Sequence, residues 1–119
     1  MSTTEPAITL DEAKAIVATK TAPKVTEESI KAKIRSVEFV QVSFIGTLCA
    51  ITMENGWIST GFSAPADPTN YDRAVGERYA YDNAFKPLWQ FEGYLLREML
   101  HQQAISAAAA EREADAREG

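Results

Sequence analysis

The sequence has little of the side-chain chemistry on which metal sites and disulfide frameworks depend. It contains one cysteine and one histidine among 119 residues, so it can form no intramolecular disulfide and shows no metal-ligand spacing. Cys49 lies in the apolar run from Leu48 to Ile51, which is typical of a small buried side chain. A nucleophile elbow, a phosphate-cradling glycine loop and a dinucleotide fingerprint are all missing from the sequence. We therefore predict no catalytic residues, no metal and no cofactor.

Long apolar runs and an excess of positive charge are also missing. No apolar stretch approaches the roughly 20 residues that span a bilayer, and the polar segment 1–6, with Glu5, does not fit a signal peptide. The 17 acidic residues outnumber the 12 basic ones, giving a net charge of −5. This balance disfavours non-specific binding to nucleic acid or an anionic membrane. By default we expect a cytoplasmic protein.

The remaining composition is that of one globular domain. Hydrophobic residues make up 45% of the chain and charged residues 24%, both ordinary values for a folded domain. After a flexible arm over residues 1–8, Thr9 and Glu12 have the spacing of a capping box, which predicts a helix over residues 10–19. Thr26, followed by two acidic residues, predicts a second helix that ends near Ser36.

Strand-like runs follow the two short helices. They cover residues 37–45, 48–53 and 57–63. Asn55-Gly56 between two apolar runs is a strong hairpin signal, and Gly46-Thr47 is predicted to form the other turn. The first run is apolar on both faces, so the antiparallel β-meander needs covering on both sides, by helices or by another subunit.

A long C-terminal helix is predicted from Thr69–Asp72 to about residue 103. Pro87 removes one helical hydrogen bond and should kink or split this helix near residues 83–86. The Ala-rich tail over residues 104–119 has little to pack against, so we expect a frayed helical or disordered tail. The predicted fold is α+β, with a single domain over residues 9–103 made of short N-terminal helices, a β-meander and a long kinked helix.

Several cations and aromatic residues could serve a small anionic ligand. Two groups of cations lie on or beside the predicted helices: Arg73, Arg78, Lys86 and Arg97, and Lys31, Lys33 and Arg35. A solvated charged surface explains them equally well, and the sequence leaves both readings open. Gln41 and Ser43 interrupt one apolar face of the first strand and could reach a polar site.

The second half of the chain carries a series of motifs in a specific order. They are Asn55-Gly56, Thr60-Gly61-x-Ser63-Ala64, Asn70-Tyr71-Asp72, Val75-Gly76, Asp82-Asn83-Ala84, Leu88-Trp89 and Glu92-Gly93-Tyr94-Leu95-Leu96. This series resembles a family of small tailed-phage proteins, the gp-forty-nine-like family, over about residues 8–100 and most clearly from residue 54. The sequence departs from the family pattern at Asp82 and Pro87, and its N-terminal third matches only in outline.

The resemblance extends to the Thoeris anti-defence protein one group and implies a function. Such a protein acts as a sponge: it binds a cyclic nucleotide immune signal, glyco-cyclic ADP-ribose, and sequesters it without cleaving it. Relatives of this kind also hold cyclic di- or trinucleotides and assemble as homo-oligomers, from dimers up to hexamers.

The candidate ligand-binding residues are chosen by their chemistry, because the resemblance does not align a ligand site. Basic side chains suit phosphates, amide and carboxylate groups suit ribose hydroxyls, and an aromatic ring can stack on a base. On that basis we predict Arg35, Arg78 and Lys86 for phosphates, Asn70 and Asp72 for ribose, and Trp57 or Phe62 for base stacking.

Other functions stay open at this point. The acidic net charge is also compatible with a protein–protein inhibitor that masks a host enzyme. A minor structural or packaging role in the virion is a third reading.

Overall fold

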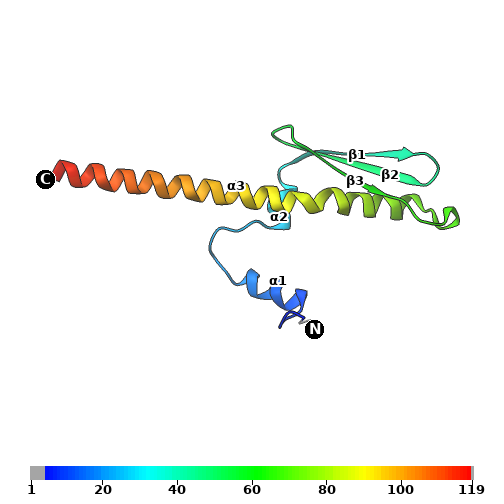
Figure 1. The fold of residues 1–119 in the computed structure, drawn as a ribbon, viewed down its shortest axis with the longest axis horizontal. Coiled ribbons are helices and arrows are strands. Elements are labelled where there is room, and N and C mark those ends of the chain that lie inside the picture. The colour runs from blue at the N-terminus through cyan, green and yellow to red at the C-terminus, as the bar shows by residue number, and fades with distance from the viewer. Residues whose placement is uncertain (1–4, 119) are drawn as a thin grey trace, which may run out of the picture.

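The computed structural model describes residues 5–118, which form a three-stranded sheet with a long helix across one face (Figure 1). In chain order the elements are α1 (Leu10–Ala18), α2 (Glu27–Lys31), β1 (Ile34–Val42), β2 (Gly46–Met53), β3 (Ile58–Ser63), a 3-10 turn (Pro68–Asn70) and α3 (Arg73–Glu118). This arrangement confirms the predicted α+β fold. Part of the predicted N-terminal arm, residues 1–4, lies outside the described residues. Within residues 5–118, no helix combines the length and apolar composition that a bilayer crossing requires.

Local hydrogen bonds define where the helices begin. Thr9 caps α1, because its hydroxyl accepts from the Glu12 amide at 3.1 Å. Thr26 forms a reciprocal capping box with Ser29 at α2. The Asp72 carboxylate accepts from the Val75 amide at 3.0 Å and caps α3, so this helix begins after Asp72, with no capping role for Thr69. Each cap satisfies amides that a helix start leaves free.

The second helix is shorter than predicted. α2 ends at Lys31 rather than near Ser36, because Ile34 and Ser36 already pair with Met53 and Thr52 of β2. Pairing with a neighbouring strand therefore outweighs the local helical pattern at this point.

The sheet is a meander with the strand order β1-β2-β3. The predicted Asn55-Gly56 hairpin is confirmed: Gly56 has φ of 91° and the Asn55 side chain accepts from the Trp57 amide at 3.0 Å. The other turn was predicted wrongly. It lies at residues 43–45, where Ser43 has φ of 58°, and not at Gly46-Thr47.

Gly46 serves strand packing instead of the turn. It pairs with Val42 in the first pair of the β1–β2 ladder, and a Cβ there would lie 2.7 Å from the Val42 carbonyl oxygen. The first strand consequently ends at Val42, so Phe44 and Ile45, which the predicted strand over residues 37–45 includes, belong to the turn.

α3 packs across β2 and β3 and has few contacts with β1. The core lies between them and includes Ile30 from α2. Its other buried members are Cys49, Ile51, Met53, Ala80, Ala84, Phe85 and Leu88. α3 approaches β3 so closely that a Cβ on Gly61 would lie 2.2 Å from the Ala84 nitrogen.

Pro87 does not split α3, which continues from Arg73 to Glu118. Two hydrogen bonds between β3 and α3 hold the helix on the sheet just before the proline. The buried Ser59 hydroxyl of β3 donates to the Ala84 carbonyl at 2.7 Å, and the Asn83 side-chain amide of α3 donates to the Phe62 carbonyl at 2.9 Å. These bonds, with Leu88 buried in the core beyond the proline, favour one continuous helix. The tail after residue 103 is helical and exposed; its fraying stays a prediction.

The sheet face turned away from α3 is apolar and uncovered by the described part of the chain. Val40, Val42, Ile58 and Phe62 lie on it and are about half exposed. The predicted division of the first strand into two apolar faces is therefore correct for residues 37–42. No element within residues 5–118 covers this outer face.

Candidate functional site

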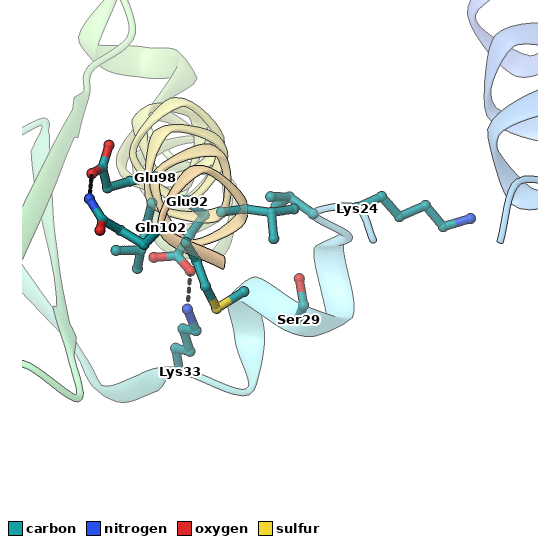
Figure 2. A pocket seen from close by; sticks show the side chains of 10 residues that line it. Lys24, Ser29, Lys33, Glu92, Glu98 and Gln102 are labelled. Carbon is teal, nitrogen blue, oxygen red and sulfur yellow. Dashed lines mark hydrogen bonds and ion pairs between the residues drawn. The ribbon is translucent and has the colours of Figure 1, made fainter. Parts of the chain in front are cut away.

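Two hollows flank the ion pair between Lys33 and Glu92, whose Nζ and Oε1 atoms are 2.5 Å apart. One, of about 480 Å³, lies between α2 and α3 (Figure 2). The other, of about 440 Å³, lies between the β2–β3 hairpin and α3, where Trp57 packs edge-on against Phe91 with ring centroids 5.6 Å apart. Both hollows are mainly apolar, and Lys33 is held by Glu92, whose side chain is only 15% exposed, so neither suits an anionic ligand.

A more polar groove runs between β1 and α3. It exists because α3 lies over β2 and β3, which leaves the inner face of β1 without a helix above it. Two hollows of about 200 and 470 Å³ make up the groove and share Phe39 and Glu77. The other residues that line this β1–α3 groove are Lys31, Val37, Val40, Gln41, Thr47, Tyr71, Arg73, Ala74, Arg78 and Tyr81.

The strand register explains which β1 side chains enter the groove. Phe39 pairs with Cys49 and Gln41 pairs with Thr47, and both partners are buried on the α3 side of the sheet. Residues directly opposite each other on paired strands share a face. Phe39 and Gln41 therefore point toward α3, and Phe39 keeps 40% of its surface exposed.

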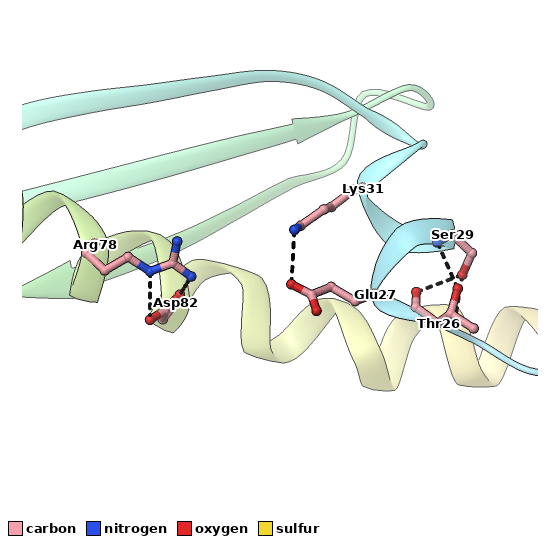
Figure 3. A network of polar contacts seen from close by, with 6 residues as sticks. All are labelled: Thr26, Glu27, Ser29, Lys31, Arg78 and Asp82. Carbon is pink, nitrogen blue, oxygen red and sulfur yellow. Dashed lines mark hydrogen bonds and ion pairs between the residues drawn. The ribbon is translucent and has the colours of Figure 1, made fainter. Parts of the chain in front are cut away.

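Three cations reach the groove, each held by a carboxylate one helical turn away. Lys31 pairs with Glu27 at 3.0 Å and Arg78 with Asp82 at 2.6 Å, as the dashed lines in Figure 3 show. The third, Arg73, pairs with Glu77. Hydrogen bonding to Asp82 raises the pKa of the Arg78 guanidinium, and hydrogen bonding to Glu27 raises the pKa of the Lys31 ammonium group. Both cations therefore stay charged at neutral pH.

These ion pairs leave the cations available to a ligand. The side chains of Lys31, Arg73 and Arg78 are 52%, 83% and 66% exposed, and solvent screens exposed ion pairs of this kind so that they contribute little to stability. A phosphate can therefore replace the carboxylate partner at small cost. The pairs also balance the local charge, so the groove attracts an anion mainly at short range.

Aromatic rings line the same groove as the cations. Phe39, Tyr71 and Tyr81 contribute to its walls, and the Arg78 guanidinium lies 5.4 Å from the centre of the Tyr81 ring. Flat rings beside planar guanidinium groups suit a ligand that combines an aromatic base with phosphates. Within residues 5–118, no group of three or more His, Cys, Asp or Glu side chains is arranged to hold a metal ion.

The structure brings only one of the seven predicted ligand-binding residues, Arg78, into the groove. Trp57 lines the apolar hollow beside Phe91, and Phe62 lies on the outer face of the sheet. The other four are exposed and do not line the groove: Arg35 lies in the β1 irregularity, Asn70 in the 3-10 turn, Asp72 at the α3 cap and Lys86 on α3. Their roles in ligand binding stay predictions.

Sequence reasoning did not select most of the groove residues as a site. Lys31 and Arg73 were among the candidate cations, and Gln41 was noted as an interruption of an apolar face. Gln41 was the one sequence feature that could indicate the groove, because a polar residue on an otherwise apolar strand face marks a part of that face that the helix does not cover. Phe39, Tyr71 and Tyr81 gave no signal, because core aromatic residues have the same spacing.

Comparison with known proteins identifies a family. The model of a family described as Phage protein (N4 Gp49/phage Sf6 gene 66) matches residues 25–100, well over half of the chain. The matched range includes β1, β2, β3 and every residue that lines the β1–α3 groove. No curated protein and no solved structure matched. The chain belongs to the Phage protein (N4 Gp49/phage Sf6 gene 66) family.

Proposed function

We propose that this phage protein is an anti-defence sponge that sequesters a cyclic nucleotide immune signal without cleaving it. The signal is glyco-cyclic ADP-ribose, and cyclic di- or trinucleotides are further candidates. The observation that carries the proposal is the β1–α3 groove, where Lys31, Arg73 and Arg78 stand beside three aromatic rings. The larger of its two hollows, of about 470 Å³, is of the size that small-molecule sites occupy.

Binding without catalysis is part of the same proposal. The only histidine, His101, is exposed on α3 well beyond the groove residues, and the only cysteine, Cys49, is fully buried. The groove itself offers arginine, lysine, glutamine, threonine and tyrosine side chains, which bind and orient phosphates and sugars. We further propose that the protein works in the cytoplasm of the infected cell as a homo-oligomer.

Titration calorimetry with glyco-cyclic ADP-ribose and with a cyclic trinucleotide tests this function. We expect tight binding of at least one of them, followed by release of the intact ligand when the protein is heated. Arg78→Ala should weaken binding by about 10- to 100-fold, the range expected for one charge-assisted hydrogen bond, and Phe39→Ala should weaken it through lost stacking.

Two further variants decide between the groove and the residues predicted from the sequence. Lys86→Ala and Phe62→Ala remove a cation and an aromatic ring that lie outside the groove, so they leave affinity unchanged if the groove is the site. Loss of binding in these variants with normal binding by Arg78→Ala would move the site to the residues first predicted. The absence of heat with either ligand would contradict the sponge function.

The second candidate function is inhibition of a host enzyme by direct contact. The observation in its favour is the uncovered apolar sheet face formed by Val40, Val42, Ile58 and Phe62, since exposed apolar patches often mark protein-binding surfaces. It predicts a stable complex with one host protein and no binding of small molecules.

A further inference from the structure

α1 is an amphipathic helix with no partner in its own chain. Leu10, Ala13, Ile16 and Val17 follow helical spacing and form one apolar stripe. None of the residues of α1 is buried, and Leu10 is 71% exposed. Figure 1 shows α1 apart from both the sheet and α3. A helix of nine residues is marginal in water without tertiary packing, so this stripe calls for a complementary surface.

The hollow between α2 and α3 offers such a surface. Its apolar lining comes from Val25, Leu95, Leu96 and Met99, and Leu95 and Met99 are each about half exposed. An amphipathic helix that lays its apolar stripe into a groove of this kind is a common mode of protein recognition.

The α1 of the same chain is held away from this hollow. The Lys24 ammonium donates to the Val17 and Lys20 carbonyls at 2.6 and 2.9 Å, which caps the C-terminal end of α1. Figure 2 shows the Lys24 side chain extending away from the hollow toward α1. With this cap in place, α1 stands apart from the hollow of its own chain.

The charges at the rims of the two surfaces are complementary. Glu12 and Lys14 stand on opposite sides of the α1 stripe by helical spacing. Glu98 and Lys24 lie on opposite sides of the hollow in Figure 2. A docked α1 can therefore place Lys14 near Glu98, which selects one of the two helix directions, whereas the Lys24 ammonium already caps α1 of its own chain.

We propose that α1 of one chain docks in the α2–α3 hollow of a second copy, and that two copies exchange α1 reciprocally. Such a two-fold exchange uses the same pair of surfaces twice and forms a closed dimer. The inference gives a surface to the homo-oligomer named in the proposed function, and it does not depend on a ligand. Residues 10–18 also lie outside the range that the family model matches.

Sedimentation equilibrium on matched variants tests the exchange. Ile16→Asp in the stripe and Met99→Asp in the hollow should each convert the assembly to a lower mass, down to the monomer if no other contact holds it. Ala15→Asp, on the neighbouring polar side of α1, should leave the assembly unchanged, and circular dichroism checks that all three variants fold.

Lys14→Glu should weaken the assembly, and Glu98→Lys in the same chain should restore it. A monomeric wild type, or variants that assemble like the wild type, would overturn the proposal.

Disulfide trapping identifies which copy contributes α1. A chain with Ile16→Cys and a chain with Met99→Cys are mixed and oxidised, while the buried Cys49 stays unreacted. We expect a covalent dimer of the two different chains. A chain that carries both Ile16→Cys and Met99→Cys serves as the comparison. If the mixed chains form no dimer and this double variant cross-links only within one chain, the second copy is excluded as the partner. Calorimetry on the wild-type chain separates the two proposals, because a monomeric wild type that still binds ligand contradicts the exchange and leaves the sponge function intact.

Discussion

At the scale of single residues, the close contact between β3 and α3 restricts which side chain β3 can carry opposite the helix. Gly61 is the point of closest approach, since an added Cβ would lie 2.2 Å from the Ala84 nitrogen and 2.3 Å from the Ala80 carbonyl oxygen. Both of those atoms belong to the helix backbone, which cannot turn aside as a flexible side chain can. The whole helix would have to move away from the sheet to admit a methyl group.

Gly61→Ala should therefore destabilise the protein by about 1–3 kcal/mol or more, the usual cost of overpacking a core. Gly93 provides the matched control, because it lies within α3 and a Cβ there meets nothing within 4 Å. Gly93→Ala should stabilise the protein by about 0.5–1 kcal/mol through helix propensity. Urea denaturation measures both changes, and equal effects of the two variants would contradict the close approach.

The single thiol reports on the same core. Cys49 is fully buried, and burial raises the pKa of its thiol because a thiolate is poorly solvated there. Below the ordinary thiol pKa of about 8.5, Cys49 is protonated in both the folded and the unfolded chain and does not lower the free energy of unfolding. As the pH rises from there through the higher pKa of the folded state, ionisation of the unfolded chain lowers the free energy of unfolding. Cys49→Ala should lose this part of the pH dependence.

Thiol labelling at pH 8 checks the burial directly. A disulfide reagent should react with Cys49 slowly in native protein and rapidly in denaturant. Fast native labelling would show that the β2–α3 core opens locally.

At the scale of elements, α3 has two halves with different roles. The half up to Leu88 supplies core side chains, whereas every residue from His101 to Arg117 is exposed. Helix propensity in the Ala-rich distal part favours the helical conformation without any packing. The distal half is therefore an extension of the domain and not a part of its core.

Truncation after Gln103 should leave the free energy of unfolding within about 0.5 kcal/mol of the full chain, as expected where no buried contact is lost. Leu88→Ala, in the packed half of the same helix, should cost about 2–5 kcal/mol. The midpoints of denaturant unfolding measure both changes. A large loss on truncation would show that the distal half packs against something, most directly a second copy.

At the scale of the whole molecule, the chain exposes too much surface for a compact monomer. Its accessible surface is 9362 Å², whereas a monomer of this length is expected to expose about 6,400 Å². The radius of gyration is 21.1 Å, against about 13–14 Å for a compact domain of this size. The projecting α3, the detached α1 and the uncovered sheet face account for the difference.

We expect the binding of an apolar fluorescent dye, per chain, to be low at high protein concentration and to rise on dilution. Self-association covers apolar surface at high concentration, and dilution exposes it by mass action. The Ala15→Asp chain serves as the control, since it should assemble like the wild type. Dye binding per chain that stays equally high at every protein concentration would contradict coverage of this surface by self-association.

The local features of this fold are determined by the sequence alone. The caps at Thr9 and Thr26 and the Asn55-Gly56 hairpin depend on hydrogen bonds between residues two or three positions apart, so a short stretch of sequence contains both partners. The α+β class and the two apolar faces of β1 follow from periodicity in the same way.

Only the tertiary structure decided the features that depend on distant contacts. Pairing of Ile34 with Met53 ended α2 early, and packing of α3 on β3 kept the helix continuous through Pro87. The candidate site belongs to this group, because Lys31, Phe39 and Arg78 meet only where α3 leaves β1 uncovered. Sequence spacing carries no record of which strand a helix covers, since that choice rests on the summed packing of residues far apart in the chain.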